Sequence, residues 1–506
     1  MTKEGLEYLS NFIENVINDN CIVRIVKQNY ALKPTKEDFI KLPVSDDTKK
    51  VYCDYLSRRM LKAYEPFMDI IRDCIFELNL DIDKAFADAN IYSLNRSIFK
   101  SYITTGKARS QENLILAEKE YDRKKFVEGI VDLLLMLSEK KPIFIMLNEA
   151  NQMSESVLFV LEELISRTSS TLHILVVVNE MGNVKGFLND SYNEFIKKCD
   201  LKGIVSDWPF QDYYETEEPE DTYVFDTSSD ELEDICTMFY TYAFGQANYY
   251  LSMIYQKVEL DKADVTIQFR INMLTLYIMV SIYRENYSYA LVLCERLNRI
   301  NAFELEDEKN YLYYYFQTMA NMYIGNEDDA RKNAILCEKM ADKIGREYEH
   351  FQSMLIKNMS ELSGWKDIWI CDKHVEVPDE LISLCYKYNY LNHLAHIYVY
   401  CFDNDYRLYT VVEGIEERTP NVTKGILLAK KLNNEKFLVE AYRKNIMVAS
   451  CNGLFQTAGY FYSKSIEIVK KENNKFEEAN IYNGLGFICC TTDKYIEANR
   501  YYNRAL

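Results

Sequence analysis

Two short runs of consecutive apolar residues lie in the first third of the chain, at positions 142–147 (Pro-Ile-Phe-Ile-Met-Leu) and 172–178 (Leu-His-Ile-Leu-Val-Val-Val). A continuous run of this length is typical of a β-strand that is covered on both faces. Between the runs, apolar residues recur at helical spacing after Ser154, which can cap a helix to about Arg167. A second helical pattern, at 124–138, precedes the first run. This order predicts a right-handed α/β unit with a parallel sheet.

From about Ala263 onward the pattern is helical and repeats. Ala290 recurs as Ala330, and Ala458 recurs as Ala498, each at an interval of 40 residues. A helix pair that repeats at a fixed period predicts an α-solenoid, in which each pair buries its apolar face against its neighbours. The period cannot be followed between residues 346 and 440.

The clearest repeat is the last segment, 479–506. Small and large residues alternate there as in a tetratricopeptide repeat, at repeat positions 1, 4, 7, 8, 17, 20, 24, 27 and 28: Ala479, Tyr482, Leu485, Gly486, Tyr495, Ala498, Tyr502, Ala505 and Leu506. Such a stack normally closes with a polar capping helix, which this sequence lacks. We therefore expect a fragment of a longer protein, truncated or uncapped at its C-terminus, with an output module beyond Leu506.

Composition fits this picture. Hydrophobic residues make up 48% of the 506 residues, and the 16 glycines and 8 prolines are few, which favours long helices with short turns. The net charge of −19 disfavours binding of this segment to a nucleic-acid backbone. The 13 cysteines are scattered without a Cys-x-x-Cys pair, as expected for reduced thiols in a cytoplasmic protein. No apolar run reaches the ~18 residues of a membrane-spanning helix, so no membrane partner is expected.

The end of each apolar run carries polar residues that suggest a family. An apolar strand followed by Asn148 and Glu149, then a helix, then a strand that ends at Asn179, resembles the Walker B to sensor 1 layout of the signal-transducing ATPases with numerous domains, of the maltose-activator type. The segment 63–67 (Ala-Tyr-Glu-Pro-Phe) is similar to a helix start between Walker A and Walker B in that family, with Pro66 in the first turn.

This resemblance implies three segments. They are a degenerate ATPase-like α/β domain at 1–225, a small helical lid or linker at 226–262, and a tetratricopeptide-like solenoid at 263–506. The expected fold class is therefore a P-loop-NTPase-like α/β domain followed by an all-α solenoid. A glycine-containing turn at 244–248 resembles the lid of the family, although the proline expected there is missing.

The phosphate-binding loop departs from the family. Such a loop needs glycines so that backbone N–H groups surround the phosphates, and then Lys and Ser/Thr. After the expected first strand, at 21–26, residues 27–35 read Lys-Gln-Asn-Tyr-Ala-Leu-Lys-Pro-Thr, without glycine, and Lys33 and Thr35 are out of register. Asn148 is neutral where a magnesium-facing carboxylate belongs.

We therefore expect no catalytic residues and no bound cofactor, with ATP as a remote alternative. The vestigial nucleotide-binding residues would be Lys33, Thr35, Asn148, Glu149 and Asn179. Their other interpretation, which the pattern favours for Asn148 and Glu149, is a strand-end turn that caps a helix.

Two other groups of side chains allow more than one interpretation. His393 and His396 lie three residues apart on one helix face, with Cys401 beyond, but no further ligands accompany them, so we expect no metal site. Tyr311, Tyr313, Tyr314 and Tyr315 can line a ligand groove, but in a chain with 41 tyrosines packing between helices is favoured.

The sequence therefore predicts a non-catalytic regulatory region. Its solenoid would bind a protein or a small effector and control an output domain, either a helix-turn-helix transcription regulator or a diguanylate cyclase. A switch that binds ATP without hydrolysing it, and a plain protein-binding scaffold, are the alternatives. No nucleophile–base set or metalloprotease motif is visible.

Overall fold

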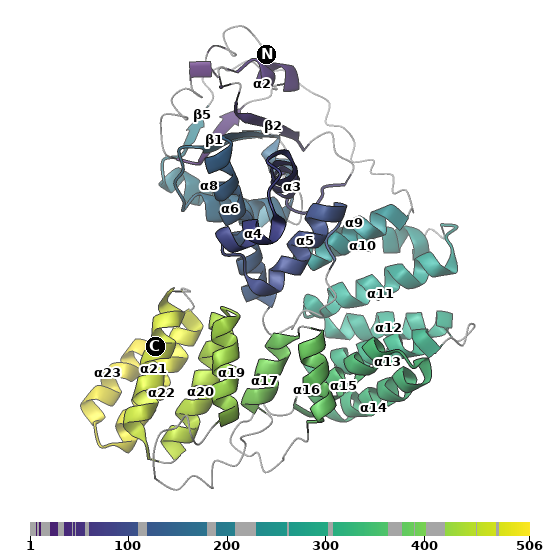
Figure 1. Ribbon diagram of the computed structural model, residues 1–506, viewed down its shortest axis with the longest axis vertical. Helices are drawn as coiled ribbons and strands as arrows, with labels where there is room; N and C mark the ends of the chain where they lie inside the picture. Colours follow the sequence, from purple (N-terminus) through teal and green to yellow (C-terminus); the bar gives the residue numbers. More distant parts are fainter. Residues whose placement is uncertain are drawn as a thin grey trace. The chain divides into compact units, whose positions relative to one another are not determined.

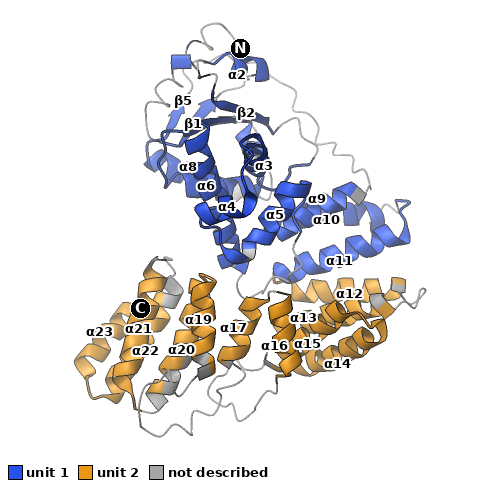
Figure 2. Ribbon diagram, in the orientation of Figure 1, with its two compact units in different colours: residues 1–113, 119–284 blue, residues 114–118, 285–506 orange. Residues whose placement is uncertain are grey.

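A computed structural model of the chain is shown in Figure 1. It describes residues 7, 10–11, 21–28, 35–42, 44–45, 47–55, 60–109, 119–179, 189–207, 229–260, 263–301, 307–362, 377–388, 390–400, 420–451, 453–471 and 475–506. The chain forms two compact units, residues 1–113 with 119–284 and residues 114–118 with 285–506 (Figure 2). Lys33, Cys401 and the side chain of Asn179 lie outside the described part of the chain.

Unit 1 is built on a five-stranded sheet. Its strands are β1 (Val23–Gln28), β2 (Lys49–Asp54), β3 (Ile143–Asn148), β4 (Leu172–Asn179) and β5 (Val205–Asp207). They lie in the order β2-β3-β4-β1-β5, and all four neighbouring pairs are parallel. The two strands predicted from apolar runs, β3 and β4, lie at the centre of the sheet. The parallel α/β unit is confirmed.

The helices of unit 1 are α2 (Lys36–Ile40), α3 (Phe67–Glu77), α4 (Ile82–Asp88), α5 (Arg96–Thr105), α6 (Lys119–Lys140), α7 (Glu155–Leu164), α8 (Asn189–Leu201), α9 (Ser229–Tyr240), α10 (Phe244–Tyr255) and α11 (Ile267–Tyr283), with the short turns η1 (Ser93–Asn95), η3 (Ala150–Gln152) and η4 (Gln256–Leu260). Ser154 caps α7 by accepting a hydrogen bond from the N–H of Val157, as predicted. The helix ends at Leu164, earlier than expected. Pro66 stands at the N-cap position before α3, so it precedes the first turn instead of lying in it.

The sheet is a buried layer because alternate residues of each strand face different helices. Phe144 of β3 stacks on Phe39 of α2, with ring centroids 5.6 Å apart, and Met146 and Leu175 belong to the same apolar cluster. All six residues of β3 are buried, as expected for a strand that is covered on both faces.

Unit 2 consists of paired helices: α12 (Tyr287–Asn301), α13 (Asp307–Ile324), α14 (Glu327–Ile344), α15 (Glu347–Leu362), α16 (Asp379–Lys387), α17 (Leu391–Tyr400), α19 (Pro420–Lys431), α20 (Glu435–Cys451), α21 (Phe455–Lys471), α22 (Lys475–Thr491) and α23 (Tyr495–Ala505). Ala290, Ala330, Ala458 and Ala498 are all buried, and each is the fourth residue of its helix. The 40-residue period is therefore a structural period, and the solenoid is confirmed.

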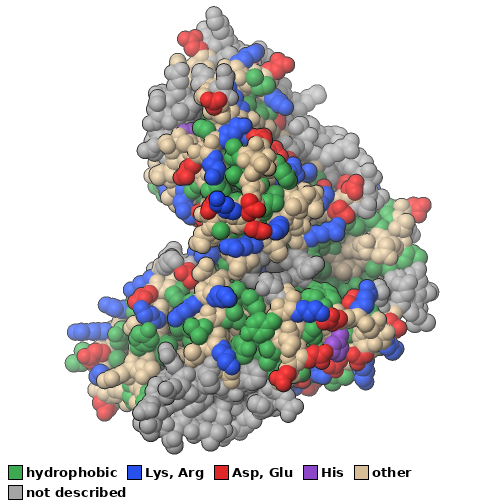
Figure 3. Space-filling model, viewed as in Figure 1, with side chains coloured by type: hydrophobic (Ala, Val, Ile, Leu, Met, Phe, Trp, Pro, Cys, Tyr) green, Lys and Arg blue, Asp and Glu red, His purple; other side chains and the backbone are tan. Residues whose placement is uncertain are grey.

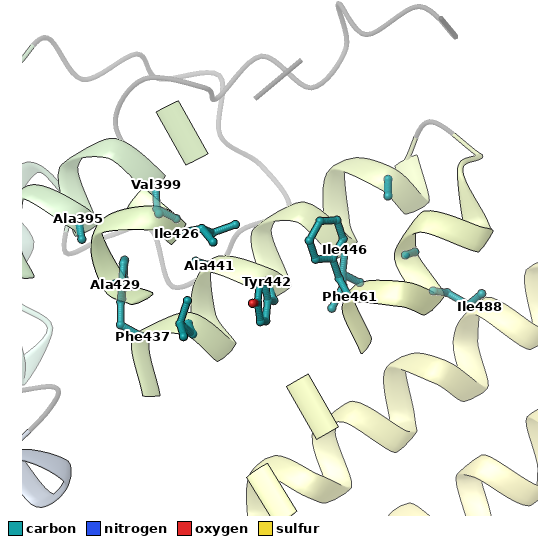
Figure 4. Packing of buried hydrophobic residues seen from close by; sticks show 13 residues of the cluster. Ala395, Val399, Ile426, Ala429, Phe437, Ala441, Tyr442, Ile446, Phe461 and Ile488 are labelled. Carbon is teal, nitrogen blue, oxygen red and sulfur yellow. The ribbon is translucent and has the colours of Figure 1, made fainter. Parts of the chain in front are cut away.

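Close helix contacts explain the small residues of the repeat. Gly486 on α22 faces Tyr502 on α23, so that a Cβ atom at Gly486 would fall 2.6 Å from the tyrosine ring. In the middle of the unit, apolar side chains from α17, α19, α20, α21 and α22 form one continuous core, which includes Phe437 and Phe461 (Figure 4). Each pair buries its apolar face against its neighbours, as a stack requires.

The boundary between the two units lies after Arg284, so that α11 belongs to unit 1. The reason is its packing, because Tyr283 at the end of α11 stacks on Phe244 of α10 and meets Phe239 of α9 edge-on. The segment boundaries at 225 and 262 stay predictions.

Candidate functional site

The polar strand ends predicted from the sequence share one edge of the sheet in unit 1. Because the strands are parallel, their carboxyl ends all reach the same edge, where ligands of open α/β sheets bind. Gln28 at the end of β1 pairs with Asn179 of β4, and Asp54 at the end of β2 pairs with Asn148 of β3. The structure therefore places Asn148 and Asn179 at the ends of neighbouring strands, β3 and β4.

Asn148 is fully enclosed and tied to a neighbouring strand. It is 1% exposed, and its Nδ2 donates a hydrogen bond of 3.2 Å to the hydroxyl of Tyr52 on β2, while its Oδ1 is buried and has no hydrogen-bond partner among the residues that the structure describes. Burial and the nearby carboxylate of Asp54 raise the pKa of Tyr52, so this hydroxyl stays protonated. A neutral amide that is held in this way brings no negative charge to a metal ion.

Glu149 turns the chain out of the sheet. It is 3% exposed, and its φ of 53° lies in the left-handed region, which a non-glycine residue adopts only at a cost of order 1 kcal/mol. It is the N-cap residue of η3, and Ser154 then starts α7. The strand-end turn favoured by the sequence is therefore present in the structure, and the nucleotide role of Glu149 stays a prediction.

Thr35 forms hydrogen bonds with a residue of its own segment, Asp38. Its hydroxyl accepts the N–H of Asp38 at 3.2 Å and donates to the Asp38 carboxylate at 2.8 Å, and the same carboxylate accepts the backbone N–H of Thr35 at 3.1 Å. This is a complete capping box at the start of α2. Burial by itself would raise the pKa of Asp38, but these hydrogen bonds from Thr35 hold it below its usual value.

An anion at the start of α2 would meet this carboxylate. The positive end of a helix attracts phosphate because its first N–H groups are unpaired. Here Asp38 supplies the negative charge from within the helix, and both the hydroxyl and the backbone N–H of Thr35 are engaged in hydrogen bonds with Asp38. The structure thus gives Thr35 a structural task, while its vestigial role in nucleotide binding stays a prediction.

Several residues of this region were missed from the sequence. Tyr52 lies on β2, which begins with Lys49 and Lys50. This strand contains no long run of apolar residues, so the pattern of the sequence does not identify it. Gln246 of α10 and Ser156 of α7 are fully buried and bonded to each other across 90 residues of sequence. No local pattern marks such a pair, because a glutamine and a serine on helices usually face water.

His393 and His396, the two histidines considered from the sequence, lie on α17. His393 is buried. Burial is the larger cause, and the neighbouring His396 the smaller one, of a lowering of its pKa to about 3, so its ring is neutral. His396 packs against Phe437, with ring centroids 4.1 Å apart. Within the described ranges no group of three or more His, Cys, Asp or Glu side chains is arranged to hold a metal ion.

The tyrosines of α13 pack between helices at two of the four positions. Tyr311 and Tyr315 are buried, and the Tyr311 hydroxyl donates to Gln352 Oε1 of α15 at 3.0 Å. Tyr313 instead donates to Glu295 of α12 at the surface. The packing interpretation is therefore confirmed for Tyr311 and Tyr315.

Charged side chains of both signs lie interspersed over the face drawn in Figure 3. Ion pairs between charged side chains include Lys49–Glu77 in unit 1 and Lys357–Glu338 in unit 2. Among the helices that the structure describes, none combines the length and apolarity needed to cross a bilayer.

Comparison with solved structures finds several matching chains, and one of them aligns over nearly the whole of this chain. The crystal structure of the Signal Transduction ATPase with Numerous Domains (STAND) protein with a tetratricopeptide repeat sensor from Pyrococcus horikoshii aligns over 98% of this chain and 95% of that chain, with 11% identity and a TM-score of 0.40. No protein-family model and no curated protein matches the sequence. At this identity the likeness concerns the fold alone.

Proposed function

We propose that this chain is a non-catalytic regulatory region, in which the solenoid binds a protein or a small effector and the α/β unit has lost nucleotide chemistry. The observation that carries the proposal is the closed capping box of Thr35 and Asp38. It places a carboxylate at the helix start that follows β1, where phosphate binding would need free N–H groups.

The strand-end edge supports the same conclusion. Magnesium in a phosphate site is held by oxygen ligands that carry negative charge. Asn148 offers one neutral oxygen, and its amide is held by Tyr52 inside the protein. With no glycine between residues 27 and 35, the backbone cannot wrap closely around a phosphate group.

The solenoid supports effector binding by its architecture. Stacked helix pairs present an extended surface that suits peptides, protein segments or small molecules. In the proposal, occupancy of this surface controls an output module, for which a helix-turn-helix transcription regulator and a diguanylate cyclase are the two classes considered. This last step rests on analogy between architectures.

Calorimetric titration of the folded chain with magnesium and ATP tests the central claim. We expect no saturable heat, which means a dissociation constant weaker than roughly 1 mM, or about −4 kcal/mol. Saturable binding that is lost in a Glu149→Ala, Asn179→Ala double variant would support the alternative, a switch that binds ATP without hydrolysing it. Hydrolysis of ATP by the purified chain would refute the proposal outright.

A second experiment separates the regulatory region from a plain scaffold. The full chain is used to recover a binding partner, and the partner is then titrated against the chain and against variants in the sheet of unit 1, such as Tyr52→Phe. A regulatory relay predicts that changes in unit 1 alter the affinity. Equal affinities for all variants would favour the scaffold.

A further inference from the structure

Positive charge is concentrated on three helices of unit 2. The helices α19, α21 and α23 pack on α17, α20 and α22, so they are the second helices of three pairs. Together they contain eight Lys or Arg residues and two Glu residues. The first helices α20 and α22 together contain four residues of each sign, and the whole chain has 78 acidic and 59 basic residues. The excess of positive charge therefore belongs to the second helices of these pairs.

The positive charges recur with the period of the solenoid. Lys424, Lys464 and Arg504 are spaced by 40 residues, and Lys430 and Lys470 are separated by the same interval. We call these five residues the basic face. Residues in the same register of a repeat stack occupy equivalent places on successive repeats. The basic face therefore consists of two rows of positive charge that run along the stack.

Buried or half-buried tyrosines support the basic face. The eighth residue of each of the helices α17, α20 and α22 is a tyrosine: Tyr398, Tyr442 and Tyr482. Lys424 Nζ lies 5.5 Å from the ring centroid of Tyr398. Lys470 Nζ and Arg504 Cζ lie 5.9 and 5.7 Å from the ring centroid of Tyr482. These cation–π contacts hold the charged ends in place above packed rings.

Most charges of the basic face are not neutralised by a neighbouring acid. Four of its five residues have no carboxylate partner among the residues that the structure describes: Lys424, Lys430, Lys470 and Arg504. Lys464 pairs with Glu467 at 3.2 Å, and such an exposed pair contributes little. The helix dipole favours a cation in a last turn, such as Lys430, but not Lys424 in the second turn of α19. The unmatched charges therefore favour an anionic partner.

An acidic protein segment fits the basic face better than a nucleic acid does. Tyr442 and Tyr482 are each 7% exposed, so their rings cannot serve as platforms on which bases stack. The net charge of −19 repels a long phosphate backbone, whereas a short acidic segment contacts only the basic face. Packed helices lie about 8–10 Å apart, so α19 and α23, which are four packing steps apart, lie within about 40 Å of each other. About 12 extended residues span that distance.

We propose that the basic face binds an extended acidic segment of a partner protein, which crosses α19, α21 and α23 and places carboxylates against both rows of charge. This inference rests on the proposed function, in which the solenoid binds a protein, and it names the chemistry of that partner.

Fluorescence anisotropy with the full chain tests the proposal. The probe is a labelled peptide of about 12 residues in which Glu and Ser alternate. Its matched peptide has Gln in place of every Glu. We expect saturable binding of the Glu peptide alone. The affinity should fall as salt is added, because exposed charges are screened beyond about 8 Å at 0.15 M ionic strength.

A variant of the basic face locates the binding surface. The triple substitution Lys424→Gln, Lys470→Gln and Arg504→Gln removes three charges and leaves side chains that still cover part of the tyrosine rings. It should weaken binding of the Glu peptide roughly 10- to 100-fold, because each exposed ion pair contributes a factor of about two to five.

The matched control lies on α14, the second helix of another pair. The triple substitution Lys332→Gln, Lys339→Gln and Lys343→Gln changes the net charge by the same amount. These three lysines are exposed as well, but they share their helix with five acidic residues. This variant should bind the Glu peptide as tightly as the wild type.

Three results would overturn the proposal. They are the absence of binding of the Glu peptide to the wild type, equal affinities of the two triple variants, and tighter binding of a labelled single-stranded oligonucleotide than of the Glu peptide. A partner protein recovered with the full chain gives a further test. If it binds the basic-face variant as tightly as the wild type, the solenoid still binds a protein, and only the acidic segment is overturned.

Discussion

Gly425 of α19 allows a close approach between two helices of the solenoid, α17 and α19. A Cβ atom at this position would fall 2.6 Å from Val399 Cγ2 and 3.0 Å from the carbonyl oxygen of Ala395, both on α17. The carbonyl belongs to a helix backbone and cannot rotate away. Gly425→Ala therefore forces α17 and α19 apart.

Gly459→Ala is the matched control. Gly459 lies within α21, and a Cβ atom there would meet no atom of the described part of the chain within 4 Å. Both substitutions replace glycine by alanine inside a helix, which stabilises by about 1 kcal/mol. Only Gly425→Ala adds the cost of overpacking, about 1–3 kcal/mol. The common helix term cancels, so Gly425→Ala should be less stable than Gly459→Ala by about 1–3 kcal/mol.

Urea unfolding followed by far-UV circular dichroism measures this difference, since the described elements of unit 2 are all helices. Hydrogen exchange in α17 and α19 localises the effect. We expect Gly459→Ala to unfold at a higher urea concentration than the wild type, and Gly425→Ala to lose protection in both helices. Equal stability of the two variants would refute the packing argument.

Three further predictions concern single side chains. Thr35→Val should lower the free energy of unfolding by about 1 kcal/mol, because the helix cap is lost. The low pKa of Asp38 in the folded state adds stability only above the pKa of this group in the unfolded state. The difference between the variant and the wild type, measured by urea unfolding, should therefore shrink as the pH falls through the acid range near 4. His393→Gln should reduce the loss of unfolding free energy that acid causes in unit 2. The pKa of His393 is about 3 in the folded state and near 6.5 in the unfolded state, so the wild type should lose about 2 kcal/mol of unfolding free energy between pH 7 and pH 5. Equal dependence of the unfolding free energy on pH for the two proteins would contradict this. Tyr52→Phe should cost about 1–3 kcal/mol, because the buried amide of Asn148 loses its acceptor, and a thermal midpoint equal to the wild type would show that the bond contributes nothing.

The sequence predicted the centre of the sheet but not its edges. β3 and β4 are continuous apolar runs, because helices cover both of their faces. β2 starts with two lysines, and β5 has only three residues, so neither produces a run of apolar positions. An edge strand is recognised by its pairing, and pairing partners are distant in sequence.

The solenoid was predictable because its repeat is local. Two intervals of 40 residues between alanines, Ala290 to Ala330 and Ala458 to Ala498, were enough to locate four buried positions that are equivalent in their helices. The candidate site was predictable only in part. The strand ends carry Asn148 and Glu149 at the expected edge, whereas the partners that decide their chemistry, such as Tyr52, come from elsewhere in the chain.

The position of β1 in the sheet has a consequence for synthesis on the ribosome. Both neighbours of β1 follow it late in the chain, and Gln28 pairs with Asn179 about 150 residues downstream. At about 5–20 residues per second, translation of that interval takes on the order of 10–30 s. During this time the apolar residues Ile22, Val23 and Ile25 lack the strands that cover them in the folded chain, so the nascent chain carries an unpaired strand that is open to aggregation.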